Sequence, residues 1–277
     1  VAKASDIELD RLNGIHDGFM GVSWMFGPAV GAGLISTVGA VNSFWVAGGL
    51  FVFAALAIAF LSVGNLGKDA RELAEEMGEV SNKSIRVGFQ VLWNDRLLRT
   101  ITISVLILAA VYLPTETVVL STYFEDLGQP ASLGIVISAL AAGSAIGSFG
   151  YGWISARLSR KNLVRTTLIG TVVSIVPMAF LPPLQILVIA GFFLGLSWGP
   201  FNPLVSTLIQ QRVPADQQGR VFGVQTAVFY AAPPLGMVAA GLSVESYGVS
   251  TTYIVLAAIL TVTAILALLT KSLRSNF

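Results

Sequence analysis

The sequence predicts an all-α polytopic membrane protein with eight transmembrane helices. Its composition is apolar, because 55% of the 277 residues are hydrophobic and 11% are charged, whereas a typical soluble domain carries about 25% charged residues. No charged side chain occurs between Asp17 and Lys68 or between Arg165 and Arg212. Each of these stretches is long enough for two bilayer crossings of about 20 residues. We therefore expect each stretch to form a helical hairpin.

Hydropathy and helix-breaking residues place the individual helices along the chain. The turns inside the hairpins, at residues 38–40, 121–130, 182–183 and 245–250, each contain glycine or proline. The expected spans are residues 18–37, 41–61, 98–120, 131–156, 163–181, 184–209, 221–243 and 251–269.

The distribution of basic residues predicts the orientation in the membrane. The four hairpin turns hold no Lys or Arg, and all sixteen basic residues fall on the opposite side. By the positive-inside rule that side is the cytoplasm, so both chain ends are expected there. Because the chain starts at Val1 with a charged segment, we expect no signal peptide and a missing beginning. Trp45, Tyr123, Phe124 and the pair Tyr247 and Tyr253 would then form an aromatic belt at the outer interface.

A linker and an internal repeat predict two helical bundles. Residues 68–80 and 84–93 carry apolar side chains at helical spacing, the second in the pattern of an interfacial helix. Residues 11–14, before the first span, match residues 220–223, before the seventh, and further matches follow at nearly the same offset. Six helices separate the two copies, so they share one orientation, as in a parallel repeat of six-helix units. The expected domains are residues 1–63 (the last two helices of a first bundle), 64–96 (a cytoplasmic linker) and 97–277 (a second bundle).

Two parallel six-helix halves are the arrangement of the major facilitator superfamily, and one motif resembles the antiporter motif of its proton-coupled exporters. The motif runs from Gly14 through Ser23 to Gly27, Pro28 and Gly31, with family spacing throughout. The resemblance implies that the eight spans are the last eight of twelve, and that Gly27, Pro28 and Gly31 serve in gating. The alternative is that the small residues only let helices pack closely in lipid.

A second motif is similar to the cytoplasmic loop signature of the same superfamily. Gly152, Arg157, Arg160 and Lys161 match the signature, whereas Ala156 stands where the family has an acid. A charge relay through that acid is therefore not expected in this half. The alternative is a cluster of basic residues that anchors the topology. Residues 86–99 also look like the loop that enters the seventh helix of bacterial drug and siderophore exporters.

Glu116 is the ionisable residue expected inside the membrane away from a helix end. Counted from Arg99 at about 1.5 Å per residue, it lies about 25 Å up its helix. An acid at such a position needs a cavity, a partner or a proton-binding role. Tyr112 precedes it by one helical turn on the same face. The alternative is an interfacial glutamate at the outer edge.

The sixth expected span carries two prolines, Pro200 and Pro203, which interrupt the helical hydrogen bonds. The carbonyl groups that they free require partners from the protein or from a water-filled cavity. The resemblance makes this helix a cavity wall, so Trp198 and Asn202 are assigned to the substrate surface, with ordinary helix packing as the alternative. His16 and Asp17 are expected to form an interfacial pair.

Other function classes find little support in the sequence. The net charge of +1 gives no indication of a nucleic-acid partner. Residues 195–199 match the GxSxG pattern of hydrolases, but they lie in an apolar helix and His16 is the one histidine of the chain. No cofactor or metal site is expected, and the sequence does not specify an oligomeric state.

The sequence thus predicts a secondary transporter rather than an enzyme. By resemblance it is a proton-coupled exporter of small amphipathic molecules that works by alternating access in the cell membrane. Its expected partners are a small-molecule substrate, protons and the lipid bilayer. An importer of the same superfamily, a transport-inactive scaffold and a membrane-embedded enzyme are the alternatives.

Overall fold

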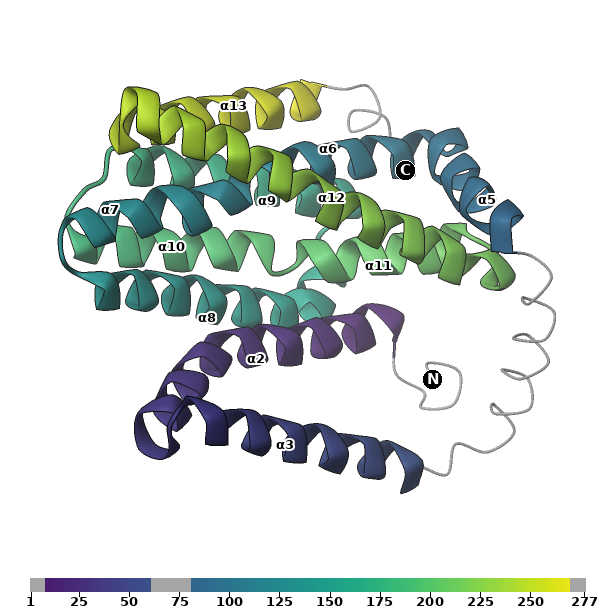
Figure 1. Ribbon diagram of the computed structural model, residues 1–277. Coiled ribbons are helices and arrows are strands. Elements are labelled where there is room, and N and C mark those ends of the chain that lie inside the picture. The colour runs from purple at the N-terminus through teal and green to yellow at the C-terminus, as the bar shows by residue number, and fades with distance from the viewer. Residues whose placement is uncertain (1–7, 61–80, 270–277) are drawn as a thin grey trace. The chain divides into compact units, whose positions relative to one another are not determined.

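The computed structural model describes residues 8–60 and 81–269, and every element within these residues is helical (Figure 1). The expected helix at residues 68–80 and the expected domain boundary at residue 63 lie outside the described residues. The elements are α2 (Leu9–Val38), α3 (Ala40–Phe60), α5 (Ser81–Asn94), α6 (Arg96–Pro114), the π-helix η1 (Thr115–Leu120), α7 (Ser121–Asp126), α8 (Pro130–Ser155), α9 (Arg160–Ala179), α10 (Leu184–Trp198), α11 (Phe201–Arg212), α12 (Ala215–Tyr247) and α13 (Val249–Leu269).

Helices overlap all eight expected spans within the described residues, and the all-α polytopic class is confirmed. Seven helical stretches in the described residues have the length and apolar composition to cross a membrane. The first expected span lies within α2, a helix of 30 residues that is not one of these seven. The expected interfacial helix at residues 84–93 lies within α5.

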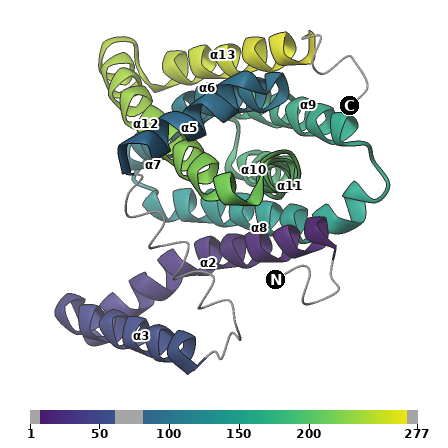
Figure 2. The same ribbon diagram turned by 90° about the vertical axis from the view of Figure 1, so that its right-hand side faces the viewer.

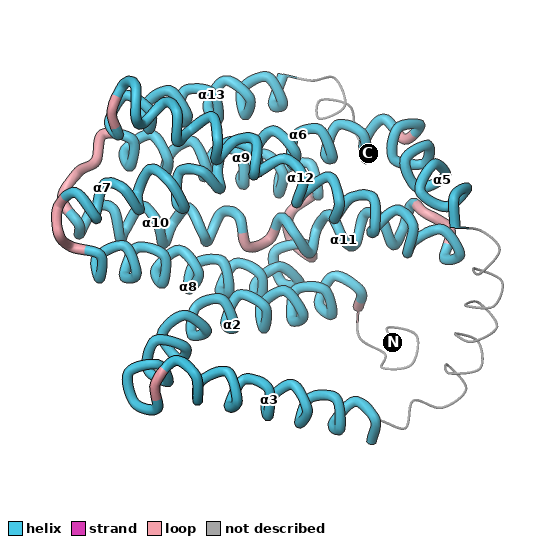
Figure 3. The backbone as a smooth tube through the Cα atoms, in the orientation of Figure 1, coloured by secondary structure: helices cyan, strands magenta, loops and turns pink. Residues whose placement is uncertain are grey.

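The sixth expected span is interrupted as its prolines predict. α10 ends at Trp198 and α11 begins at Phe201, and Figure 3 shows the break between them as a loop segment. The Ser148 hydroxyl, from α8, donates a buried hydrogen bond of 2.8 Å to the carbonyl of Gly199 in this break. A neighbouring helix therefore satisfies a carbonyl group at the interruption, as an apolar environment requires.

The helices form two compact units, and each is described by itself. The first comprises Val1–Met25 with Val87–Phe277. In it α10 packs against α8 and α9, α12 packs against α6, and α13 packs against α6 and α9. Figure 2 looks nearly along α10 and α11, and α11 contacts α8, α9 and α12. The buried core of this unit consists of apolar side chains from all of these helices.

The second unit comprises Phe26–Arg86, with the end of α2 followed by α3. Gly39 joins the two helices with a φ of 81°, a left-handed conformation that glycine adopts without steric strain. α3 exposes most of its apolar side chains, among them Phe44 and Phe51. Such a surface suits contact with lipid tails or with apolar helices.

The expected aromatic belt is wrong for two of its five members. Phe124 and Tyr253 are 2% and 0% exposed, so both pack inside the helical bundle and do not face lipid headgroups. Trp45 and Tyr247 are exposed, as residues of a belt would be. Position near a helix end was the basis for the expectation, but α7 and α13 turn these two rings inward.

Candidate functional site

The structure brings together three of the four residues expected on the substrate or proton pathway. The rings of Tyr112, from α6, and Trp198, from the end of α10, lie with their centroids 5.9 Å apart. The Tyr112 side chain is a hydrogen-bond partner of Glu116, as one turn of separation on the same face predicted. Tyr253, from α13, interacts electrostatically with the same carboxyl group.

Several polar atoms of this cluster are buried without a partner. Glu116 Oε1, Trp198 Nε1 and the Tyr253 hydroxyl have no hydrogen-bond partner among the described residues. Buried polar atoms in native proteins are normally satisfied by protein or water. Three such atoms from three helices therefore indicate a place for water, a proton or a polar ligand group. Tyr253 was missed by sequence reasoning, because nothing in the sequence brings α13 to Glu116.

Glu116 lies in η1, a single turn of π-helix that the sequence did not predict. Pro114 precedes it and has no N–H to donate to the carbonyl of Ala110 one turn earlier. A Cβ atom at Gly236 of α12 would collide with that carbonyl oxygen, so the two backbones are in close contact. Short π-helical turns inside α-helices occur frequently at functional sites.

Asn202, the fourth expected residue, lies elsewhere. It lines a cavity of about 320 Å³ together with Asp17 from α2, Ser206 from α11 and Gln225 from α12. The aromatic rings of Phe222, Phe229 and Tyr230 complete much of the remaining wall. Asp17 and Gln225 were not expected in a site. The only sequence signal for Asp17 was its place as the last charge before a long uncharged stretch.

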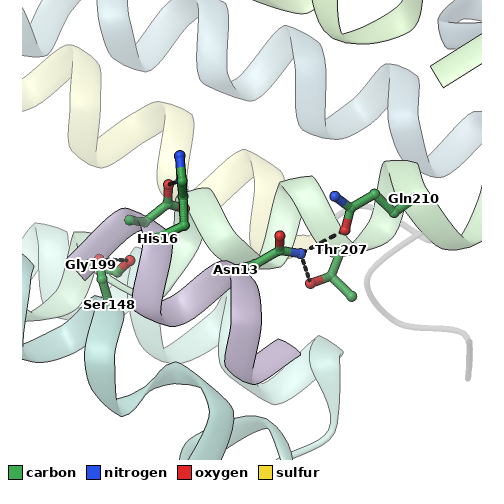
Figure 4. A network of polar contacts seen from close by, with 7 residues as sticks. Asn13, His16, Ser148, Gly199, Thr207 and Gln210 are labelled. Carbon is green, nitrogen blue, oxygen red and sulfur yellow. Dashed lines mark hydrogen bonds and ion pairs between the residues drawn. The ribbon is translucent and has the colours of Figure 1, made fainter. Parts of the chain in front are cut away.

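Asp17 does form the expected pair with His16. Its Oδ1 atom lies 3.1 Å from His16 Nδ1, and the histidine side chain is 75% exposed. One turn earlier, the Asn13 amide donates to Thr207 Oγ1 at 2.9 Å and to Gln210 Oε1 at 2.7 Å (Figure 4). These bonds connect α2 to α11. A second cavity, of about 620 Å³, adjoins this network and is also lined by Asp17.

The cytoplasmic loop motif makes contacts with the start of α2. A Cβ atom at Gly152 would lie 2.9 Å from the Cα atom of Arg11, so only glycine permits this approach. Arg160 lies 3.6 Å from Asp10, which also accepts a 3.3 Å hydrogen bond from the Tyr151 hydroxyl. Asp10 thus provides an acidic partner in a region where Ala156 replaces the family's acid.

Two further residues of the loop motif lie close to these contacts. The guanidinium carbon of Arg157 lies 3.7 Å from the ring centroid of Trp153, a cation–π contact. Lys161 is in the first turn of α9. Ser159 caps that helix by accepting a 3.3 Å hydrogen bond from the Asn162 N–H.

Two of the expected gating residues, Gly27 and Gly31, have room for a side chain among the described residues. A Cβ atom added at Gly27 or Gly31 would meet nothing within 4 Å. Close packing occurs instead earlier in α2, where Cβ atoms at Gly14 and Gly21 would lie 2.6 Å from Ser148 O and 3.0 Å from Ala145 Cα. The side chain of Pro28 lies outside the described residues.

Long apolar helices, interrupted at prolines and enclosing buried polar atoms, define a multi-pass membrane protein. Residues 115–275, more than half of the chain, match the Major Facilitator Superfamily. The chain belongs to this superfamily. Its members and the related efflux pumps are transporters and not enzymes.

Several curated proteins are similar over nearly the whole chain. Multidrug efflux pump Tap of Mycobacterium tuberculosis is 35% identical over 266 residues, which are 96% of this chain and 63% of that protein. The pump of the same name from Mycolicibacterium fortuitum is 31% identical, over 96% of this chain and 64% of that protein. Macrolide efflux protein A of Streptococcus pyogenes is 23% identical, over 88% and 60% respectively. The chain spans somewhat less than two thirds of the length of these relatives.

Proposed function

We propose that the protein is a proton-coupled exporter of small amphipathic molecules that works by alternating access. Membership in a transporter superfamily and similarity to proteins named as efflux pumps support export. The observation that carries the proposal is Glu116, a carboxyl group among Tyr112, Trp198 and Tyr253 with one oxygen unpaired. Partners of the protein would be the substrate, protons and the bilayer.

The protonation state of a carboxyl group in this environment would affect which access state is favoured, because its charge is costly inside an apolar bundle. An ionised acid inside an apolar bundle costs several kcal/mol unless a partner or water compensates it. Protonation removes that cost, and so does binding of a polar or cationic substrate. The two ligands would therefore compete for Glu116, and each would favour the access state that exposes it to its own side. Tyr112 and Trp198 would contact the apolar part of the substrate.

The remaining expectations fit into the same proposal. Residues 1–63 and 97–277 would belong to two bundles that rock about the central pathway, with residues 64–96 as the cytoplasmic linker. Gly27, Pro28 and Gly31 would seal the bundles in one access state. Gly152, Arg157, Arg160 and Lys161 would hold the cytoplasmic side, and both ends of the chain would be cytoplasmic.

Replacement of Glu116 tests the proposal in the full-length protein reconstituted in vesicles. Glu116→Gln keeps the shape of the side chain and removes its titration, so we expect substrate efflux driven by a proton gradient to fall by about tenfold or more. Residual efflux should vary less with pH than that of the wild type. Efflux of a fluorescent amphipathic dye and internal pH are recorded together.

Glu125→Gln is the matched control, because Glu125 is an exposed glutamate near the end of the same helical stretch. It should transport as the wild type does at equal protein abundance. Equal efflux by Glu116→Gln and Glu125→Gln would remove Glu116 from the mechanism. Uptake in place of efflux would indicate an importer, and wild-type protein without substrate-dependent proton movement would indicate a scaffold.

A further inference from the structure

The cavity that contains Asn202 has the size of a small-molecule site. Its volume is about 320 Å³, and α2, α11 and α12 provide its walls. Ligand pockets for small molecules typically measure about 300–1,000 Å³. The adjoining cavity of about 620 Å³ shares Asp17, Ser206 and Phe222 with it, so the two form neighbouring compartments along α2.

Two hydrogen-bond acceptors in the wall of this cavity are unused. Asp17 Oδ2 and Gln225 Oε1 are both buried and have no hydrogen-bond partner among the described residues. Asp17 uses its other oxygen for His16 at 3.1 Å. An unsatisfied buried acceptor costs about 1–3 kcal/mol, and more when it is charged. N–H donors of a ligand would satisfy such acceptors, whereas a ligand with acceptors alone would satisfy neither.

The charge of the lining favours a cation. Asp17 is the one charged side chain among the described residues that line the cavity of about 320 Å³, and no Lys or Arg lies in that lining. Ser206, Asn202 and Thr226 add uncharged polar groups to the wall. Within this lining Asp17 therefore has no basic neighbour, and its partner His16 lines the adjoining cavity.

The aromatic residues of the lining favour an organic cation over a hydrated metal ion. Phe222, Phe229 and Tyr230 all lie on α12. Aromatic faces attract cations through their electron density and provide apolar contact for the carbon skeleton of a ligand. A metal ion would instead need several oxygen ligands at about 2.0–2.6 Å, and the described residues hold no cluster of three or more His, Cys, Asp or Glu side chains.

We propose that this cavity binds a monovalent organic cation that also carries N–H groups, with Asp17 as its counter-charge and Gln225 as a second acceptor. The inference rests on the proposed transport function and specifies the class of substrate. Asp17 recognises the charge, Gln225 Oε1 accepts an N–H, and the α12 aromatic rings contact the apolar part. The site is formed by residues other than Glu116, so it is a second binding position for the substrate besides the Glu116 cluster.

Binding of ethidium to the full-length protein, purified in detergent, tests the site. Ethidium is a monovalent aromatic cation with amino groups, and its fluorescence reports binding at equilibrium. Asp17→Asn keeps the size of the side chain and removes its charge, so Kd should rise by about tenfold or more. Gln225→Leu should raise Kd less, because a neutral hydrogen bond is lost without a charge.

Two controls separate charge recognition from damage to the fold. Asp126→Asn makes the same chemical change at an exposed aspartate and should leave the Kd unchanged. The neutral probe N-phenyl-1-naphthylamine should bind the wild type and Asp17→Asn equally well. An unchanged ethidium Kd in Asp17→Asn would overturn the proposal, as would an equal rise in Kd for both probes, because the effect would then not depend on the charge of the ligand.

The binding result and the transport result can fail separately. If the wild type does not export in vesicles but binds ethidium in an Asp17-dependent way, the site stands and the exporter proposal falls. If export of ethidium is intact in Asp17→Asn, the exporter proposal stands and the site is refuted. If Gln225→Leu weakens binding of the neutral probe as much as binding of ethidium, the role given to Gln225 is refuted.

Discussion

Asp95 caps the first turn of α6 and joins it to the end of α11. Its Oδ1 atom accepts hydrogen bonds from the N–H groups of Leu97 and Leu98 at 2.8 and 3.1 Å. Its Oδ2 atom accepts one from Arg212 Nη1 at 3.1 Å. Burial raises the pKa of Asp95, but the hydrogen bonds from Leu98, Arg212 and Leu97 outweigh that effect and lower the pKa below its ordinary value.

The Asp95 cap should contribute to stability in a pH-dependent way. Asp95→Ala removes the cap and the ion pair, and we expect it to destabilise the protein by about 1–2 kcal/mol, seen as a lower thermal midpoint in detergent at pH 7. Asp95→Asn keeps a capping oxygen and loses the charge, so its effect at pH 7 should be smaller.

The sign of the pH effect follows from the lowered pKa. The stabilisation from the charge is fully present above the unfolded pKa of about 3.9 and is lost as the pH falls through the folded pKa. The midpoints of the wild type and Asp95→Asn should therefore differ at pH 7 and converge in buffers below about pH 4. A difference that is the same at both pH values would contradict the role of the Asp95 charge.

For single residues, the sequence predicts neighbours along one helix better than neighbours on different helices. Tyr112 and Glu116 are one turn apart, and the structure pairs them as expected. Asp17 and Gln225 line one cavity although a large part of the chain separates them, and no periodicity or motif links the two. Asn202 was selected for its place beside prolines, and its actual neighbours come from α2 and α12.

The interface between α8 and α10 is built on glycine. Cβ atoms at Gly195 and Gly143 would collide with the carbonyl oxygens of Leu140 and Phe192 on the opposite helix. A Cβ atom at Gly147 would lie 2.6 Å from the carbonyl oxygen of Leu196. Small residues at four-residue spacing permit such close packing of two helices. Gly191 is different, because its Cβ atom would meet Val136 at an ordinary 3.5 Å.

Gly195 and Gly191 therefore form a matched pair for a packing test. Gly195→Ala forces the backbones of α8 and α10 apart, and we expect a loss of about 1–3 kcal/mol or more, with lower abundance and a lower thermal midpoint. Gly191→Ala adds the same methyl group where there is room, and the helix propensity of alanine should offset any small steric cost. Equal midpoints for the two variants would show that the close contact at Gly195 is not needed.

Hydropathy and helix-breaking residues predicted where the helices lie. They predicted only some of the departures from regular α-helix. Pro200 and Pro203 predicted the break between α10 and α11, since proline removes backbone donors. The π-helical turn at Thr115–Leu120 was not predicted, because it occurs where Pro114 and the close approach of Gly236 from α12 act together. A contact between distant helices cannot be read from local sequence.

For the molecule as a whole, long uncharged stretches and basic loops were sufficient to predict a polytopic helical protein. Burial in a bilayer selects apolar residues over entire spans, so the signal is repeated in every helix and survives local irregularities. The orientation of the spans rests on charge alone, because the positive-inside rule counts Lys and Arg near the helix ends. It is therefore the feature of the whole chain that most needs a direct measurement.

α8 provides a sharp test of orientation. Its 26 residues extend about 39 Å at about 1.5 Å per residue, enough to cross the hydrocarbon core. Gln129 and Ser159 flank the helix and are both exposed. Because Arg157 and Arg160 flank Ser159, we expect that end to be cytoplasmic and Gln129 to face outward. The 277-residue chain has no cysteine, so single cysteines can be introduced at either position.

In intact cells a membrane-impermeant maleimide should label Gln129→Cys and spare Ser159→Cys, whereas inside-out vesicles should give the reverse. Detergent solubilisation should make both sites reactive, which controls for local steric protection. We expect the basic residues to stay on the cytoplasmic side, because their translocation would oppose the membrane potential. Replacement of Arg157 and Arg160 by glutamate reverses both charges and should therefore weaken the labelling asymmetry without changing the helices. Labelling of Gln129→Cys and Ser159→Cys from the same side would show that α8 does not span the membrane.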